Sequence, residues 1–315
     1  MQKFKKTNAS FKSFATVLSL IAICLIFGLI NPVFLTGTSL HSVLVNAVPV
    51  GLVAVGAGIC LMGGYFDMGV GMVAGLAGVL VTYLMDAELP IVLVILIPML
   101  MGAFCGLLAG SAVSFLNMNA WISTFALQQI YRTLLYVITN GVPISLGSTK
   151  YAAFTQFGRM KVFGVIQFPI VVLVVVYGLC YLFLRYRELG RSVYVVGSNP
   201  LAARICGVNL HKTRLFMFIL TNTLASVAGM LLAARMATAA PFAGESFAFE
   251  AIAAGMVSGM GGGKGNLLMV FVGVLILFVI KSGLVMIGLP DFYQYMATGL
   301  VMLVACVLQT EKKKR

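Results

Sequence analysis

Four ionisable side chains lie within or beside long apolar segments of this sequence: Asp67, Arg132, Glu250 and Lys281. An ionisable group among apolar side chains or lipid costs several kcal/mol unless it faces protein or a water-filled cavity. Such groups therefore pair with an opposite charge or contact a polar solute. We expect Arg132 to hold a carboxylate or a backbone carbonyl, with solute contact as the alternative. We expect Lys281 to extend its amine toward the membrane surface.

Asp67 stands in the segment Gly63-Gly-Tyr65-Phe66-Asp67-Met-Gly-Val-Gly71, in which glycines surround the carboxylate. This glycine density predicts an interrupted helix. Irregular backbone at membrane depth is tolerated only where it lines a cavity or is buried in protein. Two interpretations stay open. Asp67 either lines a solute path together with Tyr65 and Phe66, or caps the next helix near the membrane boundary.

Nothing in the sequence predicts catalysis or metal binding. The two histidines, His41 and His211, fall on opposite sides of the membrane in the topology that the charges predict, and the six cysteines occur singly. The run Met260-Gly-Gly-Gly-Lys264-Gly265 lacks the spacing and the hydroxyl residue of a phosphate-binding loop, so it predicts a tight turn. We therefore expect no enzymatic activity, no cofactor and no metal ion.

The composition places these residues in a membrane protein. Of the 315 residues, 61% are apolar and 9% are charged, whereas charged residues make up roughly 25% of an average soluble domain. A hydrocarbon core about 30 Å thick requires roughly 20 apolar residues per helix. The apolar residues thus suffice for nine or ten spans, which excludes a soluble enzyme, a coiled coil and a disordered regulator.

Apolar runs bounded by charges, prolines or glycine clusters predict ten transmembrane helices. They cover residues 14–34, 41–62, 68–85, 91–117, 119–139, 168–185, 214–235, 247–262, 266–288 and 291–309. We expect an all-α polytopic protein whose residues 1–315 form a single transmembrane domain. Because the number of spans is even, both termini lie on one side of the membrane.

The basic residues identify that side, since lysine and arginine concentrate in cytoplasmic loops. Fifteen of the 21 basic residues share the side of the termini, which is therefore predicted to be cytoplasmic. They are Lys3, Lys5, Lys6, Lys12, Arg185, Arg187, Arg191, Arg204, Lys212, Arg214, Lys264, Lys312, Lys313, Lys314 and Arg315. The external side carries Asp86, Glu88, Glu245 and Asp291, with Lys150, Arg159, Lys161 and Arg235 as its cations.

The same topology defines three segments outside the spans: a cytoplasmic leader over residues 1–13, an external loop near 140–167 and an internal loop near 186–213.

The net charge is +13, and the basic residues that produce it are clustered beside apolar runs instead of along one polar face. No nucleic-acid partner is therefore expected.

Glycines four residues apart predict places where two helices approach closely. The three predicted glycine faces consist of Gly71 and Gly75; of Gly102, Gly106 and Gly110; and of Gly255, Gly259 and Gly263.

The internal loop contains the signal of a further short helix. Asn199 followed by Pro200 is typical of an N-cap and first helical position. The helix would carry a small apolar stripe formed by Leu201, Ala202, Ile205 and Val208. A short amphipathic helix on the cytoplasmic face can dock in a groove of a partner; an ordinary solvated loop with one helical turn is the alternative.

Four blocks along residues 63–266 resemble a known family. They are Asp67-Met-Gly-Val-Gly71; Arg132 with Thr139-Asn-Gly-Val-Pro143; Leu189-Gly-Arg191 with Gly197-Ser-Asn199 and Ala202 to Asn209; and Glu250-Ala-Ile-Ala-Ala254 with Gly262-Gly-Lys264-Gly265. The run Asp291-Phe-Tyr-Gln294 fits as well. Together they are similar to the membrane permease subunits of bacterial ABC importers for simple sugars, the ribose, xylose, galactose and autoinducer type.

The sequence departs from the family pattern at several of these positions. Tyr65 and Phe66 replace smaller residues, Gly69 replaces the usual serine, Glu250 replaces an aspartate, and the internal loop has Leu201 where the family has glutamate. If Tyr65, Phe66 and Gly69 border the solute path, its width and polarity differ from those of a ribose permease, so the sugar stays open.

The resemblance implies two functional regions. The residues predicted to border the substrate pathway are Tyr65, Phe66, Asp67, Arg132 and Glu250. The residues predicted to form the coupling segment, which contacts an ATPase, are Asn199, Ala202, Ala203, Arg204 and Gly207.

The resemblance also implies the biological setting: a multi-pass permease of the bacterial plasma membrane, surrounded by lipid, that imports a monosaccharide or similar small polar solute. Its implied partners are cytoplasmic ATP-binding cassette subunits, an extracellular or periplasmic sugar-binding protein and a second permease copy. One alternative is an ion-coupled secondary transporter that works alone. Another is an ABC permease for nucleosides or an autoinducer.

Overall fold

The computed structural model describes residues 2–146, 151–162, 164, 166–290 and 292–310, and side chains within these ranges from residue 16 to residue 307. The predictions for Lys150, Asp291 and residues 312–315 fall outside the described residues, as do the side chains of Lys3, Lys5, Lys6 and Lys12.

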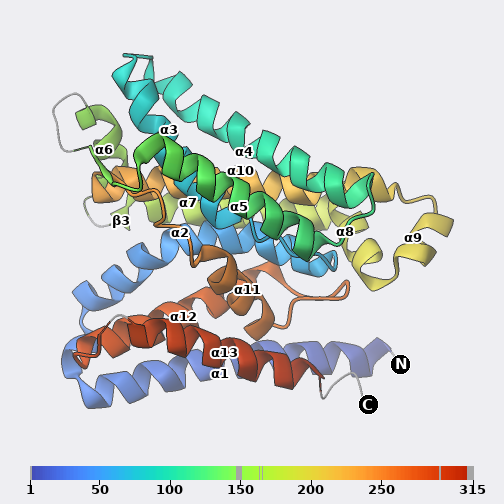
Figure 1. Cartoon of the computed structure of the whole chain (residues 1–315). Helices are drawn as coiled ribbons and strands as arrows, with labels where there is room; N and C mark the ends of the chain where they lie inside the picture. Colours follow the sequence, from blue (N-terminus) through green and yellow to red (C-terminus); the bar gives the residue numbers. More distant parts are fainter. Residues whose placement is uncertain (1, 147–150, 163, 165, 291, 311–315) are drawn as a thin grey trace.

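The described chain is almost entirely helical, which confirms the all-α fold (Figure 1). In order, its helices are α1 (Gln2–Ile30), the 3-10 helix η1 (Pro32–Leu35), α2 (Gly37–Met62), α3 (Val70–Asp86), α4 (Ile91–Ser114), α5 (Ala120–Thr139), α6 (Ala152–Arg159), α7 (Phe168–Tyr186), α8 (Glu188–Ser198), α9 (Pro200–Ile205), α10 (Leu210–Met236), α11 (Phe247–Val257), α12 (Leu267–Met286) and α13 (Phe292–Thr310). Two short antiparallel ladders pair β1 (Ile144–Ser145) with β4 (Thr238–Ala239) and β2 (Lys161–Val162) with β3 (Ile166–Gln167).

Local sequence signals account for several helix starts. The Asn119 side chain accepts hydrogen bonds from Trp121 N and Ile122 N at the start of α5. Asn209 and Asn266 cap α10 and α12 in the same way. Asparagine is favoured at these positions because its side-chain oxygen satisfies amides that have no partner within the helix.

Each predicted span coincides with a helix, but one helix is much shorter than expected. The prediction for 247–262 is wrong at its end, because α11 stops at Val257 after 11 residues. A helix of that length extends about 17 Å, well short of the hydrocarbon thickness of about 30 Å. Non-helical backbone flanks α11 on both sides.

In the part of the chain that the structure describes, five helices are long and apolar enough to cross a membrane: α2, α4, α7, α10 and α12. Shorter apolar stretches occur in α1, α3, α11 and α13. In α2, 89% of the most apolar stretch is buried, whereas only 28% is buried in α4 and in α7. Helix α2 is therefore surrounded by protein, and α4 and α7 expose apolar faces suited to lipid.

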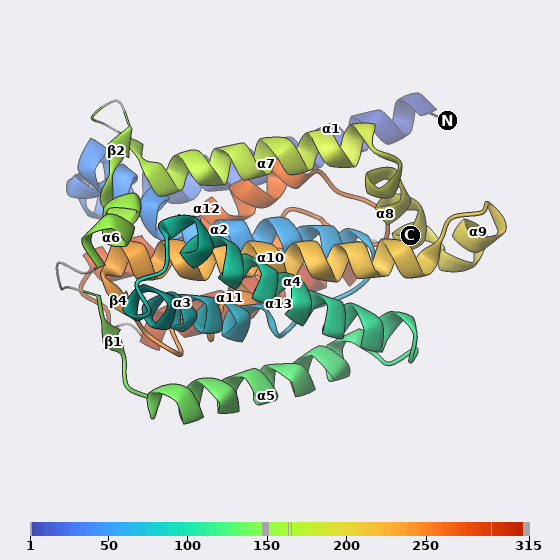
Figure 2. The ribbon, with the colours of Figure 1, turned by 90° about the horizontal axis from the view of Figure 1, so that it is seen from above.

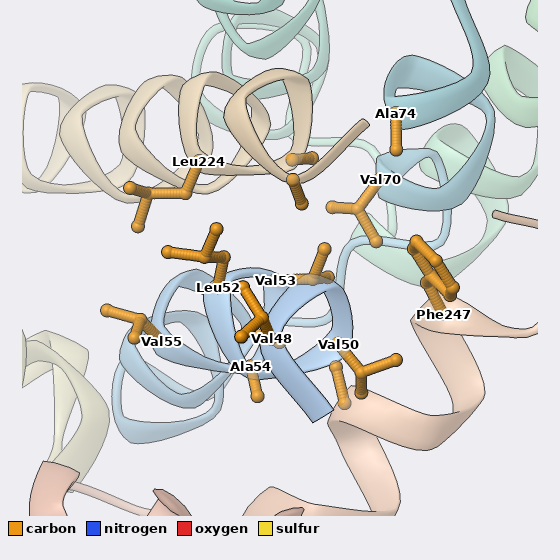
Figure 3. Close-up of a cluster of buried hydrophobic side chains, with 14 of the residues drawn as sticks. Val48, Val50, Leu52, Val53, Ala54, Val55, Val70, Ala74, Leu224 and Phe247 are labelled. Carbon is orange, nitrogen blue, oxygen red and sulfur yellow. The ribbon is translucent and has the colours of Figure 1, made fainter. Parts of the chain in front are cut away.

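The interior is built around α2 (Figure 3). Leu52 of α2 faces Leu224 of α10, Val53 faces Val70 at the start of α3, and Val50 lies beside Phe247 of α11 (Figure 3). Helix α2 packs mainly against α10, α12, α11 and α7, so it lies at the centre of the bundle.

One of the three predicted glycine faces packs against a helix as expected, and a second packs against irregular backbone. On α4, Gly102 and Gly106 lie against the backbone of α10, where an added Cβ would approach the carbonyl oxygens of Asn222 and Phe218. On α3, Gly71 and Gly75 pack against irregular backbone after α10 instead of against a helix.

The third predicted glycine face is wrong. Gly255 belongs to α11, but Gly259 and Gly263 have φ angles of +75° and +70° and lie in the turn that follows α11. Positive φ angles at these glycines explain why the helix cannot continue.

The two ends of the bundle differ in character. Helices α8 and α9 lie at one end, together with the first turns of α1 and the last turns of α13 (Figures 1 and 2). Helix α6 and the short strands lie at the opposite end (Figure 2). We call these the inner end and the outer end; that the inner end faces the cytoplasm stays a prediction.

Candidate functional site

A cavity of about 670 Å³ lies among α2, α3, α10, α11 and α12. Ser42 near the start of α2 and Met286 at the end of α12 line it, so it lies toward the outer end of the bundle. Most lining side chains are apolar, and Asn46, Arg235 and Glu250 are among the polar ones. A mainly apolar cavity of this size with a few polar groups is typical of small-molecule sites.

The segment 240–246 forms one wall of the cavity and connects β4 to α11. Its turns are held by local bonds, such as the one in which Phe247 N donates to Gly244 O at 3.0 Å. A Cβ at Gly71 or Gly75 of α3 would overlap the carbonyl groups of Gly244 or Pro241. The absence of side chains on this face of α3 therefore allows irregular backbone to pack beside the cavity.

Arg132 holds the same segment from its other side. Its Nη1 lies 2.9 Å from Glu245 Oε1, and its guanidinium lies over the Phe242 ring at 5.7 Å from the centroid. Both charged side chains are about half exposed. The expectation that Arg132 holds a carboxylate is confirmed, and the pair fixes the segment that lines the cavity.

A buried ion pair forms part of the cavity wall. Lys281 Nζ of α12 lies 2.7 Å from Glu250 Oε1 in the first turn of α11. The Glu250 side chain is 3% exposed and that of Lys281 15%. The expectation that Lys281 extends toward the membrane surface is therefore wrong, because its amine is held by the Glu250 carboxylate.

Arg235 adds a second charged group at the cavity. Its Nη2 donates to Asn46 Oδ1 of α2 at 2.7 Å, and its backbone oxygen accepts from Arg159 Nε of α6 at 3.1 Å. Its Nη1 is buried and has no hydrogen-bond partner among the described residues. That nitrogen is a donor available to a bound solute or to water.

The other predicted pathway residues lie away from this cavity. Of the five, Glu250 lines it, whereas Tyr65, Phe66, Asp67 and Arg132 do not. Nothing in the structure tests their assignment to a pathway, which stays a prediction.

Asp67 lies in the predicted break between α2 and α3 and is 2% exposed. Its Oδ1 accepts from Gly69 N at 2.9 Å, and its Oδ2 accepts from Asn222 Nδ2 of α10 at 2.6 Å. The first bond closes a turn just before α3, whose N-cap residue is Gly69 and which receives no side-chain cap, so Asp67 does not cap the helix. The second fixes the break against α10, which the sequence alone did not indicate.

The aromatic residues beside Asp67 have different surroundings. Tyr65 accepts a hydrogen bond at its hydroxyl from Arg214 Nε of α10 at 2.7 Å, and the Arg214 guanidinium lies over its ring. The side chain of Phe66 is 37% exposed. Tyr65 thus ties the break to the inner part of α10, while Phe66 stays accessible.

The predicted short helix of the internal loop is present as α9. The Asn199 side chain accepts from Leu201 N at 3.0 Å and from Ala202 N at 3.1 Å, and Pro200 occupies the first turn. Leu201 and Ile205 are 70% and 80% exposed, although both are apolar. Helix α9 lies at the very end of the molecule (Figure 2), so its apolar surface is open to a partner.

The remaining coupling residues divide into exposed and buried positions. Ala202, Arg204 and Gly207 are exposed, whereas Ala203 is fully buried against its own chain. Gly207 has a φ of +78°, which ends α9. Ala203 can therefore position α9, while its exposed neighbours are free to touch another subunit.

Helix α8 lies between α9 and the inner end of α2. A Cβ at Gly197 of α8 would overlap the Met62 carbonyl and lie 2.8 Å from Gly263 N. Gly263 N itself donates to Met62 O at 2.9 Å. We call this close contact of Met62, Gly197 and Gly263 the inner junction; it joins α8, the end of α2 and the glycine turn after α11.

Sequence reasoning missed three parts of the site. It did not pair Lys281 with Glu250, although a lysine within an apolar helix is itself a signal that an acidic partner is near. The segment 240–246 falls between two predicted spans and carried no prediction, although the glycines of α3 at 71 and 75 were an available signal. Gly197 was identified only as part of a motif, and its close contact with Met62 and Gly263 was not predicted.

The described residues contain no cluster of three or more histidines, cysteines or acidic side chains that could hold a metal ion. The arrangement can bind and guide a polar solute, because it combines an apolar cavity, a buried charge pair and a free donor with irregular backbone at both ends of α11.

Comparison with known proteins agrees with this description. The family model described as "Branched-chain amino acid transport system / permease component" matches residues 39–306. The chain is 32% identical to the ribose import permease protein RbsC of Haemophilus influenzae, over 93% of this chain and 91% of the relative. It is 31% identical to RbsC of Bacillus subtilis (94% and 92% covered) and 30% identical to the L-arabinose transport system permease protein AraH of Escherichia coli (84% and 80% covered). No solved structure matches the chain.

Proposed function

The chain belongs to the family of branched-chain amino acid transport system permease components, and we propose that it is the permease subunit of an ATP-driven importer whose cargo is a monosaccharide or a similar small polar solute. It is a multi-pass protein of the bacterial inner membrane and not itself an enzyme. The relatives named as ribose and L-arabinose permeases support a sugar as cargo.

The observation that carries this proposal is the outer cavity with its buried ion pair. Glu250 and Lys281 cancel each other's charge, so this pair offers strong hydrogen-bonding groups without adding a net charge, and Arg235 adds one positive charge to the lining. Phe247 and Phe278 line the same space and supply apolar ring surface. A neutral solute with many hydroxyl groups matches both features.

Coupling to ATP hydrolysis is proposed for α9. Its exposed apolar residues Leu201 and Ile205 lie on a capped helix at the inner end, a surface suited to a groove of an ATP-binding cassette subunit. We further propose two such subunits, a second permease copy, and a soluble sugar-binding protein at the outer end. Residues 1–315 would form one transmembrane domain.

The pathway is proposed to continue from the cavity along α2 and α3. Both helices line the cavity, α2 through Val50 and α3 through Ala74. The segment 63–69 connects the end of α2 to the start of α3. Tyr65, Phe66 and Asp67 would then border the inner part of the path. Arg132 would act through Glu245 by positioning the cavity wall.

The proposal is tested by uptake into vesicles that contain the permease and its genetic neighbours, the ATPase and the binding protein. The labelled solutes are D-ribose, L-arabinose, D-xylose, D-galactose, adenosine and leucine. We expect uptake of at least one sugar that requires internal ATP and continues when a protonophore and a sodium ionophore collapse the ion gradients.

Two results would contradict the proposal. Uptake by the permease alone that follows an ion gradient would identify a secondary transporter. ATP-driven uptake of adenosine or leucine without uptake of any sugar would retain the importer and change its cargo.

A further inference from the structure

The Glu250–Lys281 pair is unusual in its position, because it is both buried and part of a cavity wall. Its two atoms are 2.7 Å apart, and both residues line the cavity. The pair joins the first turn of α11 to α12.

A purely structural tie between α11 and α12 does not require this chemistry. Replacement of a buried ion pair by apolar side chains of similar volume is often neutral or stabilising. Around it the walls are apolar: Val50 and Phe247 line the same cavity, and Lys281 Nζ lies 5.3 Å from the centroid of the Phe278 ring. A charge pair at this place is therefore better explained by what the cavity binds.

The pair also has hydrogen-bonding capacity beyond its own contact. An ammonium group carries three donors, and a carboxylate offers about four lone-pair positions. The ion pair uses one of each, so a solute in the cavity can accept from Lys281 and donate to Glu250 at the same time.

Two neighbouring hydroxyl groups of a sugar present the complementary arrangement. In a gauche vicinal diol the two oxygens are separated by about the distance of a hydrogen-bonded pair, which matches the 2.7 Å between Nζ and Oε1. One hydroxyl can accept from the amine while its neighbour donates to the carboxylate, and the apolar face of the ring can pack on Phe278.

We infer that the Glu250–Lys281 pair is the specificity determinant of the cavity and binds a vicinal diol of the cargo. This inference rests on the proposed sugar cargo, and it assigns the recognition of hydroxyl groups to these two side chains. Arg235, whose Nη1 is buried without a partner among the described residues, contributes a further donor to the same cavity.

The experiment measures how strongly uptake distinguishes D-ribose from 2-deoxy-D-ribose and 3-deoxy-D-ribose. Together these two analogues interrupt every vicinal diol of the ribopyranose ring. Uptake by wild-type permease is compared with uptake by Lys281→Met and Glu250→Gln permeases in the same vesicles with the same binding protein and ATPase. If wild type carries another pentose better, that pentose and its 2-deoxy and 3-deoxy derivatives replace ribose.

For each protein the preference is the ratio of sugar uptake to deoxy-sugar uptake. The preference of wild type is then divided by the preference of the variant. The binding protein contributes the same preference in every sample, so its contribution cancels. A hydrogen bond to a charged group corresponds to about tenfold discrimination or more. We therefore expect the preference for the intact sugar to fall about tenfold for at least one analogue in each variant.

An unchanged preference for both analogues, within about twofold, would overturn the inference and leave the pair a structural tie. Arg185→Gln is the control, since it removes a cation of α7 that hydrogen-bonds to Tyr181 and does not line the cavity. This variant should keep the wild-type preference even if its uptake is slower.

A third variant covers the case in which the first two do not transport. Glu250→Asp keeps both charges and draws the carboxylate back by one methylene, and the same criteria apply to it. Absence of sugar uptake by the wild-type protein would instead refute the proposed function, so the two failures are distinguishable.

Discussion

A methyl group at position 197 would separate α8 from the inner ends of α2 and α11. Gly197 lies against the backbone of Met62 and of Gly263, where an added Cβ would overlap the Met62 carbonyl and lie 2.8 Å from Gly263 N. Backbone atoms cannot rotate away as a side chain can. The Gly197→Ala substitution must therefore displace α8 or the glycine turn.

The magnitude follows from two opposing effects. Overpacking at a tight contact costs about 1–3 kcal/mol, and the upper part of that range applies where the neighbours are backbone. Alanine in place of glycine within a helix contributes roughly 1 kcal/mol in the opposite direction. We expect a net destabilisation of about 2 kcal/mol in the inner junction, where α8 meets the end of α2 and the glycine turn after α11.

The functional consequence should be a loss of coupling. If α9 transmits ATPase movement through α8 to Met62 and Gly263, a displaced α8 transmits it poorly. At 1.4 kcal/mol per tenfold change, the sugar transported per ATP hydrolysed should fall at least about tenfold. The assays are uptake and phosphate release from the same vesicles, together with thermal unfolding of the purified permease.

Gly178→Ala in α7 is the matched control, because an added Cβ there meets no atom within 4 Å. It makes the same change in an open position of a helix and should unfold at the wild-type temperature or above. Wild-type coupling in a Gly197→Ala protein with a wild-type melting temperature would refute the role of the inner junction.

Three further predictions concern α9, the α2–α3 break and the topology. Replacing the exposed Ala202 by glutamate should leave the chain folded and abolish sugar-stimulated ATPase activity of the assembled importer; unchanged stimulation would remove α9 from the ATPase contact. Asp67→Asn should keep expression but reduce uptake by a large factor, because the new amide nitrogen would face a donor, either Asn222 Nδ2 or Gly69 N, at a cost of about 1–3 kcal/mol; wild-type uptake at matched protein levels would show that transport does not need the Asp67 carboxylate. Single cysteines at 152–158 should react with an impermeant maleimide from outside, and those at 192–212 only after permeabilisation; labelling of both segments from one side would contradict the predicted topology.

The approximate positions of the membrane segments could be predicted from the sequence, because the free energy of placing a helix in the membrane depends on the composition of about 20 consecutive residues. The Asn199 cap of α9 was predictable for a similar reason. Its side chain bonds to the amides of Leu201 and Ala202, so the entire interaction lies within four residues of sequence.

The exact end of α11 could not be predicted in this way. Gly255 and Gly259 have the spacing of a helical face, but glycine also permits the positive φ that Gly259 and Gly263 adopt. Which conformation is taken depends on the neighbours, and here Gly263 N finds Met62 O in α2.

The sequence by itself determined the class of this protein, the places of its membrane segments and its family, because these depend on composition and on short motifs. Only the tertiary structure decided the site. Glu250 and Lys281 are 2.7 Å apart although α11 and α12 are separated by the glycine turn, and Arg132 reaches Glu245 from α5. Such pairs arise from the packing of whole helices, so no local pattern of residue types indicates which charge meets which.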